Sequence, residues 1–204
     1  MDDLALAMAA EFRTVDAPAA IAALDALGEN LSRVASTTGA RPQELVVACG
    51  QVLGRELGFA GDRERYDDPD NSMLDVVLSR RRGLPILLSV VYIEVARRAG
   101  IPLAGVGLLG HFVVGHFGAD PPVLLDPFSG GVLIETPVSQ GSVRPWRLDE
   151  IAWRMLNNLV VSYQRRGDLT PAIRAAQMRL MLPAPPADRD VMNAELRALQ
   201  SRLN

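Results

Sequence analysis

The sequence predicts an α+β fold in which a buried helix is followed by a small antiparallel sheet, with further helices before and after this unit. Three observations predict it. The run from Ile86 to Ala96 is almost entirely apolar, which is typical of a helix buried on all sides. His111–Phe117 and Val123–Leu125 then read as short strands. Helical patterns fill residues 1–65 and the C-terminal part from about residue 148.

The limits of the buried helix are marked by proline and glycine. Pro85 suits a first helical position, where its fixed φ and missing N–H cost nothing. Gly100 ends the helix and Pro102 prevents its continuation. The apolar run is shorter than the ~20 residues that cross a bilayer, so we expect a core helix. Ser89 interrupts it, and the simplest expectation is a hydrogen bond to a helix carbonyl.

Two residues in the predicted strands are candidates for a catalytic role. His111 begins one predicted strand and Asp126 follows the next, so the two side chains can lie within hydrogen-bond reach. The aspartate would then orient the imidazole and support its charged form. A packing histidine and an Asp-Pro turn remain the structural alternative. His116 lies on the opposite face of the same strand, which argues against a two-histidine metal site, and we predict no metal and no cofactor.

Helix signals outside this unit are weaker. Asp16 is a candidate N-cap, and Ser72-x-x-Asp75 resembles a capping box. Cys49 lies on the apolar face of an amphipathic helix that opens at Pro42, where a free cysteine behaves as a small hydrophobe. The polar segment TPVSQGSVRPWRLDE reads as a linker to the C-terminal helices.

The motifs RRRGLP, YIEVARRAGIP, GVGLLGHFVV, LLDPFSGG and RMLNNL occur in this order between about residues 66 and 182. Together they resemble the bacterial SirB-type transglutaminase-like family. The resemblance implies a transglutaminase-like (papain-like) core with N-terminal helices over residues 1–147. It also implies a tetratricopeptide-like helical segment over 148–204, where NLVVSYQRRGDLTPAIRAA fits one helical pair.

The wider superfamily uses a Cys-His-Asp triad, and the resemblance places His111 and Asp126 at two of its positions. The cysteine position falls at about Pro85 or Ile86, neither of which is a nucleophile. We therefore predict a non-catalytic protein-binding or scaffold protein. The alternative is a hydrolase or acyl transferase in which His111, oriented by Asp126, activates Ser89 or a water molecule.

Composition narrows the classes of partner. The chain has 204 residues, 49% hydrophobic and 22% charged, with a net charge of −3 and an isoelectric point of about 5.4. This balance does not favour nucleic acid. The start of the chain lacks the basic region of a signal peptide, and one cysteine forms no intrachain disulfide. We expect a soluble cytoplasmic protein whose partner is another protein or a peptide, and not a membrane.

Overall fold

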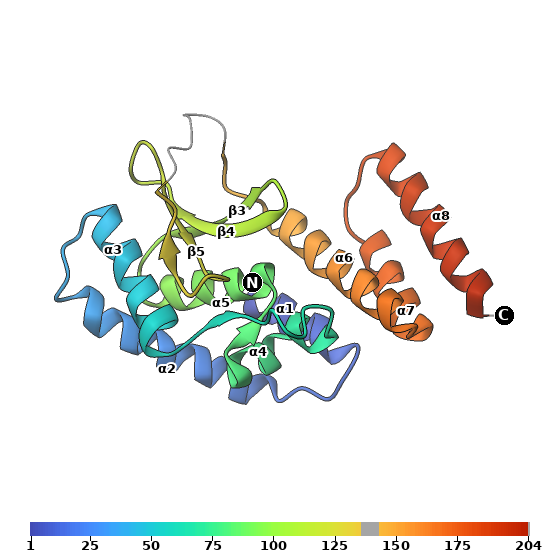
Figure 1. The fold of residues 1–204 in the computed structure, drawn as a ribbon, viewed down its shortest axis with the longest axis horizontal. Coiled ribbons are helices and arrows are strands. Elements are labelled where there is room, and N and C mark those ends of the chain that lie inside the picture. Colours follow the sequence, from blue (N-terminus) through green and yellow to red (C-terminus); the bar gives the residue numbers. More distant parts are fainter. Residues whose placement is uncertain (136–142, 204) are drawn as a thin grey trace.

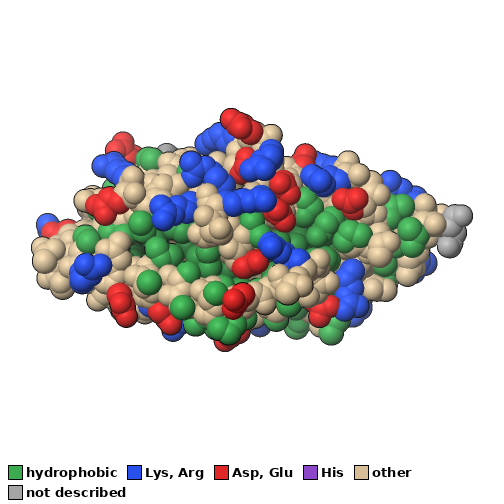
Figure 2. Space-filling model, turned by 90° about the horizontal axis from the view of Figure 1, so that it is seen from below, with side chains coloured by type: hydrophobic (Ala, Val, Ile, Leu, Met, Phe, Trp, Pro, Cys, Tyr) green, Lys and Arg blue, Asp and Glu red, His purple; other side chains and the backbone are tan. Residues whose placement is uncertain are grey.

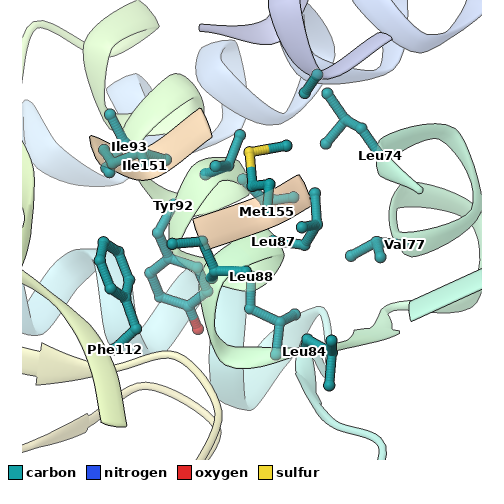
Figure 3. Packing of buried hydrophobic residues seen from close by; sticks show 14 of the residues in the cluster. Leu74, Val77, Leu84, Leu87, Leu88, Tyr92, Ile93, Phe112, Ile151 and Met155 are labelled. Atoms are coloured by element: carbon teal, nitrogen blue, oxygen red, sulfur yellow. The ribbon is translucent and has the colours of Figure 1, made fainter. Parts of the chain in front are cut away.

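Helix α5 (Pro85–Arg98) lies at the centre of the fold. The structure is a computed structural model that describes residues 1–135 and 143–203. Pro85 occupies the first turn of α5, and every residue from Ile86 to Ala96 is buried, as the apolar run predicts. Figure 3 shows side chains of α5 packed among those of α4 (Leu74–Arg80), β4 (His111–His116) and α6 (Leu148–Arg166). A helix apolar on all sides is thus covered on all sides.

The sheet has four antiparallel strands in the order β3-β4-β5-β6. Their bounds are Leu103–Leu108, His111–His116, Val123–Asp126 and Val132–Leu133. In the register of β4 and β5, Val114 pairs with Leu125, and both belong to the main core. The opposite face buries a smaller cluster of Val106, Val113 and Leu124. The predicted small antiparallel sheet is confirmed, with both faces carrying apolar residues.

Helices on the other side of α5 complete the layers. Figure 1 shows the sheet above α5, with α2 (Ala17–Ala35) and α4 below it. Asp16 caps α2 by accepting a 3.0 Å hydrogen bond from the backbone N–H of Ala19, as predicted. The N-terminal helices are α1 (Asp2–Ala10), α2 and α3 (Pro42–Cys49). Helix α3 continues without a break as a π-helix, η1 (Gly50–Glu56).

The predicted capping box at Ser72 is wrong. Residues Pro69–Ser72 form a short 3₁₀ helix (η2), in which the Asp68 carboxylate accepts from the N–H of Asp70. Helix α4 therefore starts one residue later, at Leu74, with Met73 at its N-cap and no side-chain cap. Two-residue parallel strands then flank this region, β1 (Ala60–Gly61) and β2 (Arg82–Gly83).

The chain ends in three helices, α6, α7 (Leu169–Leu180) and α8 (Pro186–Leu203). Gly167 ends α6 in the left-handed conformation at φ 79°, which suits glycine at this position. Buried residues of α6 and α7 belong to the same apolar cluster as α5. Residues 136–142 of the predicted linker lie outside the described part. Whether residue 148 starts a separate domain stays a prediction. Within the described residues, no helix is long and apolar enough to cross a membrane.

Candidate functional site

His111 and Asp126 lie together at one end of the sheet. His111 is the first residue of β4 and Asp126 is the last residue of β5, and the two strands are antiparallel neighbours. His111 Nε2 is 3.0 Å from Asp126 Oδ2. The histidine side chain is 32% exposed and the aspartate 13% exposed. Figure 2 shows the molecule from below, with basic and acidic side chains interspersed among hydrophobic ones and no histidine visible on this face.

The Asp126 carboxylate is fixed on its other side by backbone. Its Oδ1 accepts hydrogen bonds from the N–H groups of Phe128 at 2.9 Å and Ser129 at 3.2 Å. Its Oδ2 is thereby aimed at the histidine. The ring nitrogen Nε2 of His111 faces this carboxylate, and the other ring nitrogen, Nδ1, points away from it.

Two glycines in the following turn hold it against the π-helix. Gly130 and Gly131 both have positive φ, 75° and 73°. A Cβ added at Gly54 would stand 1.9 Å from the Gly130 carbonyl oxygen, and one added at Gly50 would stand 2.4 Å from that of Gly131. Glycines on both sides therefore allow backbone to pack on backbone. The contact places the turn that carries Asp126.

Phe128 forms an aromatic and cationic cluster beside the pair. Its ring stands edge-on to His111, with centroids 6.3 Å apart, and edge-on to Tyr66 at 6.0 Å. The Arg63 guanidinium carbon lies 4.9 Å from the centroid of the same ring. Among the described residues, Arg63 makes no ion pair with a carboxylate. The Phe128 carbonyl accepts from the N–H of Gly61 at 2.9 Å, which joins the 59–70 loop to the site.

Neither Ser89, the predicted candidate nucleophile, nor Cys49 is joined to this pair. Ser89 is fully buried, and its hydroxyl has no hydrogen-bond partner among the described residues, so it does not bond to His111. Cys49 is also fully buried, and burial raises the pKa of its thiol to about 12. Its predicted role as a core residue matches this position. At the start of α5 the backbone carries Leu84, Pro85 and Ile86, none of which has a nucleophilic side chain.

Sequence reasoning located His111 and Asp126 but missed the Phe128 cluster. The dense charges of the loop FAGDRERYDDPD are typical of a solvated connection, although such loops also line clefts. Arg63, Tyr66 and Phe128 are brought together by tertiary contacts between distant segments. The weak signal was the presence of an arginine and a tyrosine within a charged loop. No group of three or more histidine, cysteine, aspartate or glutamate residues suited to a metal ion occurs in the described ranges.

Comparison with known proteins agrees with this architecture. Residues 18–155 match the transglutaminase-like superfamily. A UPF0162 protein of Xylella fastidiosa is 44% identical over 100 residues, which cover 49% of this chain and 36% of that protein. A UPF0162 protein of Pseudomonas aeruginosa is 32% identical over 150 residues, covering 66% of this chain and 55% of its own length.

A shorter match joins this chain to a eukaryotic protein. F-box only protein 21 of Mus musculus is 38% identical over 71 residues, 35% of this chain and 11% of that protein. The chain thus spans about a third to about a half of the bacterial relatives named above. No solved structure matches it. The family match covers more than half of the sequence and spans α2 to the first half of α6, so this chain belongs to the transglutaminase-like superfamily.

Proposed function

We propose that this chain is a non-catalytic, SirB-type member of the superfamily that binds a segment of another protein. The start of α5 supports this proposal, because the resemblance puts the superfamily's cysteine at about Pro85 or Ile86, and neither side chain is a nucleophile. Cys49, the one cysteine of the chain, is buried with its thiol pKa raised to about 12. A thiol that stays protonated and inaccessible is not a nucleophile.

The residues around His111 suit recognition of a polypeptide. Tyr66 is 46% exposed, and Arg63 stacks on Phe128 with its N–H donors available to a ligand. Tyrosine, arginine and a partly exposed histidine combine apolar area with hydrogen bonding, the composition of binding hot spots. The helices that follow extend this role. We propose that α6 and α7 are a tetratricopeptide-like pair, since one such pair buries its apolar face only by docking on a core or a partner.

The test combines a search for turnover with a binding measurement. The purified chain is incubated with a chromogenic ester, and with a glutamine peptide plus an amine. We expect rates equal to those of His111→Ala. A photocrosslinking residue at Tyr66 then captures the polypeptide that contacts the cluster, and the captured protein is purified and titrated by calorimetry. We expect His111→Ala to weaken its binding about 5- to 10-fold, and Arg33→Ala, exposed on α2, to have no effect. Saturable turnover that disappears in His111→Ala would overturn the proposal.

The alternative is a hydrolase or acyl transferase that uses water. The 3.0 Å contact between His111 and Asp126, with Oδ1 held by two backbone N–H groups, favours it. In this version Nδ1 of His111 takes a proton from a water molecule that attacks an ester or amide carbonyl. The water route has more support than the Ser89 route, because Ser89 is buried and makes no hydrogen bond to the base. The same turnover assay separates this function from the binding function.

A further inference from the structure

A second concave site lies at the start of α6. It is a cavity of about 310 Å³ between the first turns of α6 and the connection from α7 to α8. Its walls include Trp146, Trp153 and two prolines, and its acidic lining residues are Asp149, Glu150 and Asp188. Among the residues that the structure describes, no lysine or arginine lines it. The volume is at the low end for ligand sites, which is enough for a single large side chain.

Both indoles are held in place by contacts outside the cavity. The Trp146 ring packs edge-on against Phe112, with centroids 5.1 Å apart, and its backbone N–H donates to Gly105 at 2.8 Å. The Trp153 ring already interacts with one cation, because the guanidinium carbon of Arg179 lies 5.7 Å from its centroid. Arg179 is buried and does not line the cavity, so it does not fill it. The aromatic walls are therefore preorganised, and Trp153 already contacts a guanidinium within this protein.

The carboxylates are not equally available. Glu150 is occupied, because it accepts from the Arg144 guanidinium and, at 2.7 Å, from the backbone N–H of Arg147. Asp149 receives the Arg147 side chain on Oδ1 at 2.9 Å, which leaves Oδ2. Asp188 is exposed in the first turn of α8 and makes no ion pair within the described part of the chain. Asp188 and one oxygen of Asp149 thus remain free to pair with a positive charge.

We propose that this cavity binds the arginine side chain of a partner protein. A guanidinium is flat, always charged, and stacks on aromatic rings while it donates to carboxylates, so it satisfies indoles and aspartates together. The proposal rests on the protein-binding function above and adds the chemistry of one partner residue. It concerns a different surface from the His111 cluster, so each can fail alone.

The chain itself supplies the probe for the test. It contains two tryptophans, and both line the cavity, so intrinsic fluorescence reports its occupancy. Acetyl-Gly-Arg-Gly-amide is titrated into the full chain, with the citrulline tripeptide as the matched ligand that has the same shape but no charge. We expect a saturable fluorescence change with arginine that weakens with added salt, and a much smaller change with citrulline. Equal responses to the two peptides, or no saturable response to arginine, would overturn the proposal.

Two substitutions on α8 provide a second test of the proposal. Asp188→Asn removes the free carboxylate at an exposed position, and we expect affinity for the arginine peptide to fall about 2- to 5-fold. Asp190→Asn, on the same helix and also exposed but outside the cavity, is the matched control and should bind as wild type does. If both variants bind equally well, Asp188 is not part of the site and the proposal fails. The turnover assay at His111 is unaffected by either result, so this outcome leaves the proposed function to its own test.

Discussion

His111 Nε2 lies 3.0 Å from Asp126 Oδ2, and the same carboxylate holds two backbone N–H groups with its other oxygen. Asp126 therefore joins a strand end, a turn and an imidazole in one place. Its loss would leave two backbone donors without their acceptor and would remove the carboxylate that faces His111. The pair has a structural role whether or not it also takes part in chemistry, and the two roles can be separated by substitution.

Asp126→Ala should lower the free energy of unfolding by about 1–3 kcal/mol, because the N–H groups of Phe128 and Ser129 lose their acceptor. Asp126→Asn should cost less, since the amide oxygen still accepts hydrogen bonds from the turn. Urea denaturation of both variants measures the difference. Equal losses in the two variants would show that the turn does not depend on an oxygen at this position.

Cys49 should be almost unreactive in the folded protein. With its pKa raised to about 12 by burial, only about one thiol in ten thousand is ionised at pH 8. We expect iodoacetamide to label the native chain very slowly and the urea-unfolded chain at the rate of an ordinary thiol, as followed by intact-mass spectrometry. Native labelling as fast as that of the unfolded chain would contradict the buried position and reopen the question of a cysteine nucleophile.

Gly54→Ala should destabilise the fold by about 1–3 kcal/mol or more. The new Cβ would stand 1.9 Å from the Gly130 carbonyl oxygen, so the π-helix or the turn must move. Gln51→Ala is the control, because Gln51 is exposed in the same helix, and it should change stability by less than about 0.5 kcal/mol. Denaturation midpoints compare them, and a Gly54→Ala midpoint close to the control would mean that the two backbones are not in close contact.

Glu150 should make stability sensitive to acid. The hydrogen bond from Arg144, and then that from the Arg147 N–H, lower the pKa of Glu150 from 4.5 to about 2. A carboxyl whose pKa is lower in the folded state stabilises the fold above its unfolded value, and this contribution disappears as pH falls through the folded value. Wild type should therefore exceed Glu150→Gln in stability at pH 6. The gap should close between pH 4.5 and about 2 in thermal unfolding, and a gap that does not change with pH would refute the assignment.

The central helix and its strands were predictable because their signals are local. The apolar run from Ile86 to Ala96, bounded by proline and glycine, has no stable arrangement except burial. Strand alternation and the Asp-Pro end of β5 placed His111 and Asp126 on neighbouring strands, and their contact confirms that they meet. Their roles, and that of Ser89, stay predictions, because contact alone does not reveal chemistry.

Other features depend on contacts that the sequence does not display. The helical pattern after Pro42 continues through Cys49 into residues 50–56, and nothing in it distinguishes an α-helical turn from the π-helix that forms there. Its close approach to Gly130 is a tertiary effect. Likewise Arg63 reaches Phe128 across a long stretch of chain. Ser72 lies at the end of η2, which Asp68 caps, and it does not form the predicted capping box at the start of α4.

The hydrogen bond from Trp146 to Gly105 also protects an open edge of the sheet. Strand β3 is an outer strand, and unpaired N–H and C=O groups on outer strands are templates for pairing with other chains. The segment that carries Trp146 covers this edge. Its backbone N–H donates to the Gly105 carbonyl, and its indole packs against Gly107. A chain shortened before residue 143 would lose that cover and offer β3 to its neighbours in solution. We therefore expect the described residues just before α6, 143–147, to limit aggregation through this edge.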